Sequence, residues 1–348
     1  MKRLFLSMLT LLVAVVGAEA KNWKIGPSSV SGMNFASINA AMSSTDVKKG
    51  DTLYLDQFYN EKDVQIVNKR VVIIGTGYDT TQTDEQVVAC LTGSLDLKVG
   101  DVIVKSVKLN IVNFYNENCT IDRCYANAVI TMSSTAGKNN VYSSYIDGYI
   151  QGYNSSSKSN IDIQNCVILT NSSLDHHLIS YFDSSVIKNN TIIRTTHHYA
   201  GGDRFGLYDI TNSQIIDNII LYTNGSNSYQ YCMSGSLWES GSGNAIEHNI
   251  TSTNNIPTYP TNKTGFGGSS AELFTLEGNF SDYYELAEKS AALGYATDGG
   301  EVGCHGGMFG CPSGGRPQYI PYFTKVIVGS RTEDGKLPVK VTIKIQDE

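Results

Sequence analysis

Apolar and polar positions along the chain recur in a frame of six residues: an apolar residue, any residue, two mostly polar residues, any residue and a second, mostly apolar residue. The copies are VKSVKL from Val104, IDRCYA from Ile121, VYSSYI from Val141, IQNCVI from Ile163, IKNNTI from Ile187, IIDNII from Ile215 and IEHNIT from Ile246. Their starts lie 17, 20, 22, 24, 28 and 31 residues apart, so the unit is kept while the segments between units grow. A fixed unit with variable insertions predicts a solenoid.

Each unit is too short and too rich in β-branched residues for a helix, and it reads as two short strands with a corner between them. Asn tolerates the left-handed backbone conformation of a sharp bend. In a stack of coils the corners lie above one another, so we expect a ladder of Asn190, Asn218 and Asn249. Cys166, Ser144 and Cys124 continue this ladder in the other copies. A β-sandwich is the alternative, but sandwiches do not keep one six-residue frame through many segments.

The two ends of the solenoid need covering, because an end coil exposes core residues and unpaired strand edges. Phe35, Ile38 and Ala41 are spaced for a short amphipathic helix that caps the first coil. PQYIPYFTKVIVGS and LPVKVTIKIQD near the C-terminus predict a pair of strands that closes the other end, with an attachment element as the alternative.

Several stretches resemble a known family: FASINAAMSSTDVKKGDTLYLDQFY (35–59), VQIVNKRVVIIGTGYD (64–79), the corner repeats and YYELAEKSAALGYATDGGEVGCHGG (283–307). They are similar to parallel β-helix proteins of the pectate-lyase-like superfamily, especially secreted proteins of gut Bacteroidetes. The resemblance implies an all-β, right-handed parallel β-helix with a short N-terminal capping helix and a C-terminal β closing segment. The superfamily includes lyases, hydrolases, epimerases and adhesins, so it does not fix an activity.

The chain divides into three parts. Residues 1–20 have a basic start, an apolar run and small residues at Ala18 and Ala20, which is typical of a signal peptide. Residues 21–315 are expected to form the β-helix with its N-terminal cap, and residues 316–348 a β-strand tail that packs on the solenoid. We therefore expect an exported protein, in the periplasm, at the cell surface or outside the cell. No later apolar stretch is long enough for a transmembrane helix.

The charge balance bears on the partner. The formal net charge is −7, and removal of Lys2, Arg3 and Glu19 with the signal peptide takes away a net +1, which leaves −8. Such a chain is a poor partner for nucleic acid. Charged residues make up 17% of the chain, against about 25% in typical proteins, and Ser, Thr, Asn and Tyr supply the polar surface instead. This composition permits a polysaccharide partner, and we expect a monomer.

Three insertions carry the candidate site: residues 170–178, 194–205 and 222–239, each after the second apolar run of a frame. Loops on a rigid scaffold tolerate growth and carry binding groups, and three consecutive coils should present them on one edge. The candidate catalytic residues on this edge are His198, Asp203, Arg204 and Glu239. The candidate substrate-binding residues are His176, His177, His197, Tyr229, Tyr231 and Trp238. They supply the aromatic faces, bases and carboxylates that a sugar site uses.

Three functions stay open for this edge. A lyase could use His198 or Arg204 as its base, with Ca²⁺ as a cofactor that stabilises the anion. A hydrolase could use Asp203 and Glu239 as paired carboxylates. A non-catalytic surface or adhesin-like protein would bind glycan or protein with the same loops. The sequence motifs of pectate lyases and polygalacturonases are absent, so the sequence leaves enzyme and binding protein as alternatives. The two histidine pairs could also bind a metal ion.

Seven cysteines cannot all pair. Cys304 and Cys311 lie in the glycine-rich stretch GCHGGMFGC, and we expect a disulfide between them in an oxidising compartment. Zinc held by Cys304, His305 and Cys311 is the alternative, although no fourth ligand is evident. Cys124 and Cys166 are expected two coils apart, about 9.6 Å, which is too far for a disulfide, so we expect buried free thiols.

Overall fold

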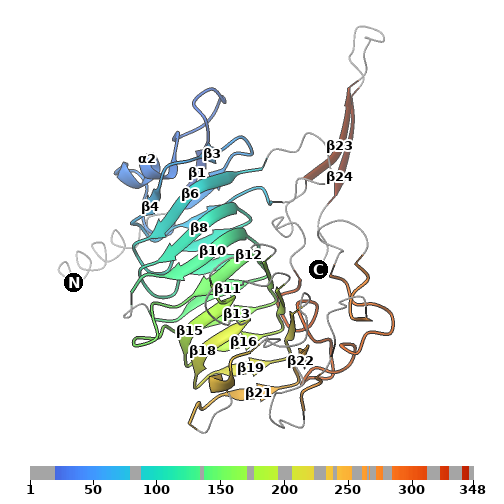
Figure 1. Ribbon diagram of the computed structural model, residues 1–348. Coiled ribbons are helices and arrows are strands. Elements are labelled where there is room, and N and C mark those ends of the chain that lie inside the picture. The colour runs from blue at the N-terminus through green and yellow to red at the C-terminus, as the bar shows by residue number, and fades with distance from the viewer. Residues whose placement is uncertain are drawn as a thin grey trace, which may run out of the picture.

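The computed structural model describes residues 20–78, 88–133, 137–170, 176–194, 206–222, 233–237, 241–252, 261–264, 266, 272–276 and 284–311, together with the backbone of 322–328 and 339–344. The predicted signal peptide therefore lies outside the described residues, apart from Ala20. Short parallel strands stack into an elongated solenoid, and one short helix lies at its N-terminal end (Figure 1). The fold is a parallel β-helix, as the repeated frame predicts.

The strands form two long parallel sheets. The first sheet contains, in spatial order, β1 (Asn22–Ile25), β2 (Thr52–Leu55), β5 (Val72–Ile74), β7 (Ile103–Lys105), β9 (Thr120–Asp122), β11 (Asn139–Tyr142), β13 (Ile161–Gln164), β16 (Val186–Lys188), β19 (Gln214–Ile216) and β21 (Ala245–Glu247). The second sheet contains β3 (Asn60–Glu61), β4 (Gln65–Val67), β6 (Cys90–Leu97), β8 (Lys108–Phe114), β10 (Tyr125–Thr131), β12 (Tyr145–Gln151), β14 (Val167–Thr170), β15 (Ile179–Asp183), β17 (Thr191–Arg194), β18 (Leu207–Thr211), β20 (Ile219–Tyr222) and β22 (Ile250–Thr251).

The repeated frame sets the register of the first sheet. The seven frame starts are neighbours in one row, from Val104 beside Ile121 to Ile215 beside Ile246. All seven side chains are fully buried in the hydrophobic core of the solenoid. A slip by one residue would turn each of these apolar side chains outward, so the row of frame starts holds the coils in alignment.

The expected corner ladder is present and fully buried. The side-chain oxygen of Asn218 accepts from the backbone N–H of Asn190 at 2.9 Å, and Asn249 does the same for Asn218 at 2.9 Å. Each side-chain amide also donates to a backbone carbonyl of the preceding coil, as Asn218 does to Ile187 O at 2.8 Å. Asn262 extends the ladder by one step.

The earlier coils follow the same pattern with other residues. Ser144 accepts from the Cys124 N–H at 3.1 Å, and Asn190 accepts from the Cys166 N–H at 2.9 Å. Cys124 and Cys166 are buried free thiols, as expected. From Cys124 onward the ladder position is therefore occupied by small polar or polarizable side chains, whereas the first copy of the frame has Val107 there.

The left-handed residue of each corner is not the ladder asparagine, which corrects the expectation from sequence. It is the preceding residue: Asn189 (φ 52°), Asp217 (φ 59°) and His248 (φ 52°). The reason is a division of roles. The turning residue needs a positive φ, whereas the next residue must point its amide into the core to reach the coils above and below it.

A second ladder lies at the other end of the first-sheet strands. Ser185 accepts from the Ile161 N–H at 2.9 Å, Ser213 from the Ser185 N–H at 2.9 Å, and Asn244 from the Ser213 N–H at 2.9 Å. Ser and Asn at these positions satisfy buried backbone donors at a bend where the sheet cannot. The sequence analysis did not identify this ladder.

The predicted capping helix is α2 (Ile38–Ser43). The Ser37 side chain caps it by accepting from the Ala40 N–H at 3.1 Å. Ile38, Ala41 and Met42 are buried against the first coils. The helix therefore covers the N-terminal end of the core, as its spacing predicts.

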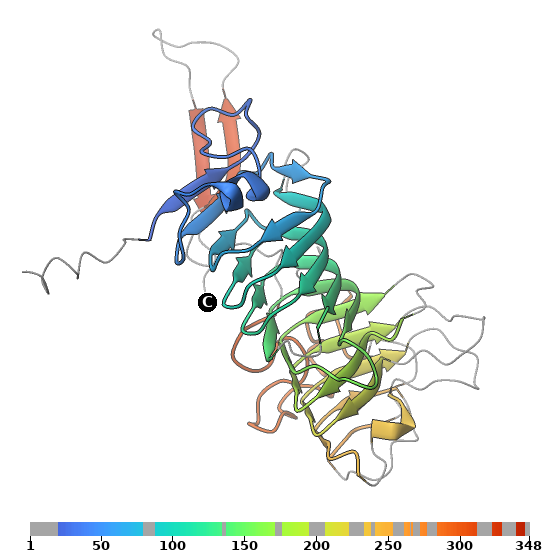
Figure 2. The ribbon, with the colours of Figure 1, turned by 90° about the vertical axis from the view of Figure 1, so that its left-hand side faces the viewer.

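The two C-terminal strands β23 (Tyr322–Val328) and β24 (Val339–Lys344) pair antiparallel and form a sheet of their own. Both views place this hairpin beside the N-terminal end of the solenoid rather than below the last coil (Figures 1 and 2). The chain reverses after β22 and runs back along the solenoid, so its last strands cannot close the far end as the sequence analysis expected. Packing of residues 316–348 on the solenoid stays a prediction.

The Asn218→Ala substitution should lower the free energy of unfolding by about 3 kcal/mol, because it leaves several buried backbone and amide groups without partners. Urea unfolding followed by circular dichroism measures the change. Asn60→Ala, at an exposed position of β3, is the matched control and should have little effect. Equal effects of the two substitutions would contradict the role of the ladder.

Asp51 supplies a pH-dependent contribution to stability. Its buried carboxylate accepts from Lys21 N at 2.8 Å, Trp23 Nε1 at 2.7 Å and Lys48 N at 2.9 Å. Burial raises the pKa of Asp51, but these hydrogen bonds outweigh burial and hold the pKa below its ordinary value of 3.8. The ionised form is therefore favoured by folding.

We expect Asp51→Asn to lower the free energy of unfolding by about 2 kcal/mol at pH 7. The difference from wild type should persist down to about pH 4 and shrink at lower pH, as the folded carboxylate becomes protonated. Urea unfolding of both proteins at pH 7 and at pH 3 measures this. A difference that grows on acidification would show that the sign is wrong.

Candidate functional site

The outer face of the second sheet, which points away from the core, is divided into an apolar and a polar half. In β14, β17 and β20 every residue is buried, because both faces are covered. The outward side chains there include Leu169, Ile193 and Leu221, which form a second hydrophobic cluster. The residues that cover them come from later in the chain: Leu273, Phe274, Tyr284, Ala292, Ala296, Val302 and Cys304.

Residues 284–311, here called the returning segment, cross the coils in reverse order. The Gly303 N–H donates to Asp217 O at 2.9 Å. Asn165 Nδ2 donates to Cys304 O at 2.9 Å, and Ser143 Oγ donates to Phe309 O at 2.8 Å. The segment therefore moves from the β19–β20 corner back to the β11–β12 corner, which Figure 1 shows as the orange trace beside the solenoid. It covers the apolar half of the outer face.

The polar half, over β6, β8 and β10, holds a groove of about 330 Å³. Its lining residues are Cys90, Leu91, Thr92, Lys108, Leu109, Asn110, Tyr125 and Asn127. The strands alternate here: in β8 Leu109 and Val112 point into the core, whereas Lys108 and Asn110 point outward. The polar and aromatic part of the outer face is open over these strands. The apolar part, over β14, β17 and β20, is covered.

Tyr125 is the aromatic centre of this groove. Its ring stacks on Tyr145, with centroids 5.7 Å apart and an interplanar angle of 10°. Its hydroxyl donates to Asp147 Oδ2 at 2.9 Å, and Lys108 Nζ lies 5.5 Å from the ring centroid. Burial raises the pKa of Tyr125, and Asp147 raises it further. The hydroxyl therefore stays protonated, and the ring is held in a fixed orientation.

A row of amides runs beside Tyr125 across three coils. Asn127 Nδ2 donates to Asn110 Oδ1 at 2.8 Å, and Asn110 Nδ2 donates to Thr92 O at 2.9 Å. The row lies where the strands of the second sheet shift register, between Leu91 and Ser94 and between Ala126 and Ala128. These irregularities bend the sheet and turn the amides outward.

The next coil needs a glycine at this bend. A Cβ on Gly148 would lie 2.0 Å from the carbonyl oxygen of Asn127 in the coil below. The backbones of neighbouring coils therefore approach too closely for any side chain at this position.

The three predicted insertions leave the solenoid at this same corner. Thr170, Arg194 and Tyr222 are register neighbours at the ends of β14, β17 and β20. The chain re-enters the second sheet at Ile179, which pairs with Leu207. In the preceding coil the chain is not interrupted at this point. There β12 is one strand, which pairs first with β14 and then with β15. The insertions therefore replace the bend that carries the amide row, and they start from one edge as expected.

The third insertion rejoins the second sheet at Met233, inside its predicted range 222–239. Met233, not Trp238, lies beside Leu207. The following residues Gly235–Leu237 form the short 3-10 helix η1, which contacts β18.

His176 and His177 are the only candidate substrate-binding residues within the described ranges, and both rings are stacked. His176 stacks on Tyr149 at 4.1 Å between centroids, and His177 stacks on Tyr208 at 3.9 Å. His177 is buried. The remaining candidates on this edge lie outside the described residues and stay predictions: His197, His198, Asp203, Arg204, Tyr229, Tyr231, Trp238 and Glu239.

Arg194 was not a candidate, yet its side chain is almost fully buried where the second insertion begins. Its Nη1 donates to His176 O at 2.9 Å and thereby joins two insertions. The groove residues Lys108, Asn110, Tyr125, Asn127 and Asp147 were missed too. The signal available for them was the polar alternation of KLNIVNF and YANAVIT, which contrasts with the continuous apolar runs VILT and IILY.

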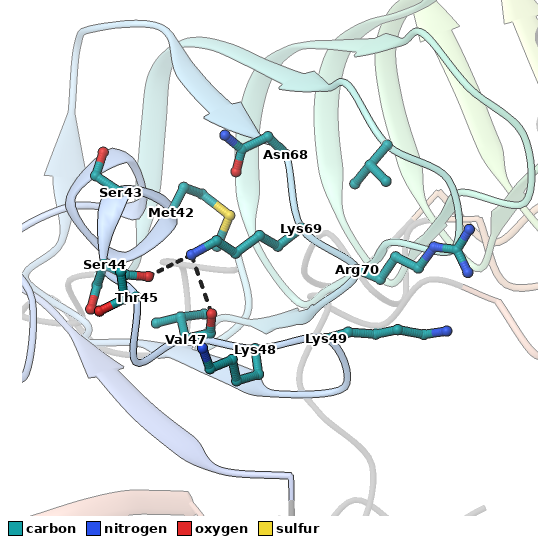
Figure 3. Close-up of a pocket in the computed structure, with 11 residues that line it drawn as sticks. Met42, Ser43, Ser44, Thr45, Val47, Lys48, Lys49, Asn68, Lys69 and Arg70 are labelled. Atoms are coloured by element: carbon teal, nitrogen blue, oxygen red, sulfur yellow. Dashed lines mark hydrogen bonds between the residues drawn. The ribbon is translucent and has the colours of Figure 1, made fainter. Parts of the chain in front are cut away.

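A second pocket, of about 570 Å³, lies at the N-terminal end beside α2 and is lined by four cations (Figure 3). Lys69 Nζ donates to Ser44 O and, at 3.2 Å, to Val47 O. Arg70 forms an ion pair with Asp101 at 3.0 Å. Lys69 thus holds the chain that follows the helix, and Arg70 is paired with a neighbouring coil, so we assign this pocket to the structure of the cap.

Cys304 and Cys311 are free thiols in the structure and lie in contact with His305. Burial raises the pKa of the Cys304 thiol, but hydrogen bonds with Cys311 and His305 outweigh burial and lower it. The expected disulfide between the two cysteines stays a prediction.

Comparison with protein-family models, with curated proteins and with solved structures finds no match for this chain. The described residues also contain no helix with the length and apolar character of a membrane span. The chain is thus identified by its architecture, a parallel β-helix, and function has to be argued from the groove and its surroundings.

Ile193→Ser should loosen the returning segment, because it removes an apolar contact from the second hydrophobic cluster and costs about 2–3 kcal/mol. We expect faster amide hydrogen exchange in residues 284–311, with exchange in β6 and β8 unchanged. Ile66→Ser, at an exposed position of β4, is the matched control. Unchanged exchange in the returning segment of Ile193→Ser would contradict its docking on β17.

Proposed function

We propose that this chain is an exported polysaccharide-binding protein of the pectate-lyase-like superfamily, which holds a glycan in the groove over β6, β8 and β10. One observation carries the proposal. The outer face of one sheet is apolar and covered downstream, but it is open upstream, where a fixed tyrosine ring lies beside a row of amides. Such a strip matches the alternation of C–H faces and hydroxyl groups on a sugar chain.

The groove residues suit a sugar ligand by their chemistry. The amides of Asn110 and Asn127 offer both donors and acceptors, as sugar hydroxyls do. Lys108 adds one cation beside the ring, which could bind the carboxylate of a uronate. Lys108 and Asp147 bring opposite charges to the groove, so a neutral or weakly acidic glycan suits it better than a highly charged one.

The direction of the groove supports an elongated ligand. The amide row and the starts of the three insertions lie along one corner that follows the solenoid axis. A glycan bound over β6, β8 and β10 and extended downstream would reach Thr170, Arg194 and Tyr222, where the three predicted insertions begin. The proposed ligand contacts thus include both the groove and the predicted loop residues.

Degradation of the bound polysaccharide is the second candidate function. It is favoured by the common origin of the three insertions at one corner, because the substrate cleft of polysaccharide-active members of the superfamily lies beside such a strand column. His198 or Arg204 would serve a lyase, with Ca²⁺ as a cofactor, and Asp203 with Glu239 would serve a hydrolase. Within the described groove Asp147 already accepts from Tyr125, so we place binding rather than catalysis there.

Binding is tested by electrophoretic retardation in gels that contain neutral or uronate-rich polysaccharides. Tyr125→Ala and Asn127→Ala should each weaken retardation by the retarding glycan about tenfold, which corresponds to about 1.4 kcal/mol. Tyr54→Ala, at an exposed position of β2 in the first sheet, should bind as wild type does. Circular dichroism spectra and thermal unfolding establish that the variants are folded.

The same glycans, incubated with and without Ca²⁺, test degradation through absorbance from unsaturated ends and through reducing sugar. Both signals rising would indicate a lyase, and reducing sugar alone a hydrolase. Retardation that persists in both groove variants would overturn the proposed groove. If no glycan causes retardation and none is cleaved, the polysaccharide function is wrong.

A further inference from the structure

Cys304, His305 and Cys311 form a cluster between the returning segment and the solenoid. Cys304 is fully buried, and its N–H donates to Thr191 Oγ1 of β17 at 3.1 Å. Its carbonyl accepts from Asn165 Nδ2, from the corner of another coil, at 2.9 Å. His305 and Cys311 are half-buried, and the exposed Met308 lies in the loop between them. The cluster is anchored to the scaffold through Cys304, while His305 and Cys311 keep part of their surface exposed.

The three side chains converge as metal ligands do. One ligand atom from each residue lies within 4.8 Å of the others. Tetrahedral ligands bound at about 2.0–2.3 Å from a zinc ion are themselves about 3.3–3.8 Å apart. The three atoms therefore need to approach one another by at most about 1.5 Å to bind one ion. Gly310, next to Cys311, has open space around it and permits such a movement, since glycine restricts the backbone least.

The orientation of His305 is a second, independent sign. Its Nε2 lies 2.8 Å from the carbonyl oxygen of Tyr284 and donates to it. Nδ1 is then the nitrogen that is left for the cysteine side of the cluster, and in the neutral ring it carries the lone pair that a metal ion would bind. A metal-binding histidine commonly has this arrangement, in which a backbone carbonyl fixes the tautomer and the ring plane. The carbonyl of Tyr284 therefore serves as an outer-shell partner that leaves His305 ready to bind a metal ion.

We propose that Cys304, His305 and Cys311 bind one Zn²⁺ ion, with the fourth position taken by water or another small ligand. Two thiolates and an imidazole favour a borderline-soft cation over Ca²⁺ or Mg²⁺, which prefer oxygen ligands. The ion would link the returning segment at both ends of the loop 304–311, and through Thr191 and Asn165 to two coils. It would act as a structural clamp that keeps the apolar half of the outer face covered.

This site does not depend on the proposed polysaccharide function, because it shares no residue with the groove. It does exclude the disulfide expected from sequence, since two sulfur atoms joined to each other cannot both bind a metal ion as thiolates. The oxidised and the metal-bound forms of the protein are therefore distinguishable by experiment.

The test uses the full exported chain, purified with a reductant and freed of metal by a chelator that is then removed. Co²⁺ serves as the spectroscopic probe, because thiolate ligands give it an intense near-ultraviolet charge-transfer band. We expect one Co²⁺ to bind per chain, and one Zn²⁺ to displace it and abolish the band. His305→Ala and Cys311→Ser should each weaken Zn²⁺ binding by more than the 10- to 100-fold (roughly) that loss of an outer-shell partner costs.

Cys119→Ser is the matched control. Cys119 is a buried free thiol whose Sγ donates to Val99 O at 3.4 Å, and serine can replace it as donor. This variant should bind Co²⁺ as wild type does. In the metal-bound wild type, hydrogen exchange of residues 284–311 should be slower than in the metal-free protein, and His305→Ala should abolish this difference.

Three results would overturn the proposal: no charge-transfer band in the fully reduced protein, a band that persists unchanged in both His305→Ala and Cys311→Ser, or a Cys304–Cys311 disulfide that forms even when Zn²⁺ is present in excess. Peptide mapping without reduction detects the disulfide. Circular dichroism of each variant establishes that lost binding does not reflect unfolding. His305→Ala removes only a half-buried side chain and keeps both cysteines, so its free thiols can still be counted.

Discussion

The structure depends on how buried backbone groups are satisfied at the corners of the coils. Strands supply partners for one another along the sheets, but at each corner the chain turns and its N–H and C=O groups lose those partners. An unpaired buried N–H costs about 1–3 kcal/mol, and a solenoid repeats this cost at every coil. The side chains of Asn190, Asn218 and Asn249 remove it by accepting from the coil before and donating to its carbonyls.

The outer face of the second sheet has an apolar half and a polar half. The apolar half stabilises the fold, and the polar half leaves room for a ligand-binding groove. Downstream, the outward residues of β14, β17 and β20 are apolar and pack under the returning segment. Upstream, the same face carries Tyr125 and the amide row in the open groove. The returning segment thus folds back over the apolar outward residues of β14, β17 and β20. The polar outward residues of β6, β8 and β10 are left as a surface for a ligand.

The returning segment is held by polar contacts at corners as well as by apolar packing. Asp217 is a left-handed corner residue, and its carboxylate accepts from the N–H and hydroxyl of Thr297 at 2.8 Å and 2.7 Å. Asn165, another corner residue, binds the carbonyls of Cys304 and Gly306. Residues that first serve to turn the coils therefore also hold the segment that covers them, which places the cysteine–histidine cluster directly on the scaffold.

Much of the fold could be read from the chain. The frame of six gave the register, because its apolar starts must face the core together, and the ladder residues follow from that register. The capping helix followed from the spacing of Ile38 and Ala41. The left-handed residue was predicted one position too late. Both Asn189 and Asn190 are compatible with a turn, and only the tertiary structure shows which of the two amides points inward.

The candidate site was predicted only in part. The origin of the three insertions at one edge followed from their position after the second apolar run. The groove did not, because Thr92, Lys108 and Tyr125 come from three coils and no local pattern links them. The sequence by itself determined the coil, its register and its corners, since these depend on periodic local choices. Tertiary structure alone decided which side chains from distant coils meet, because the returning segment and the groove bring together residues that lie far apart in the sequence.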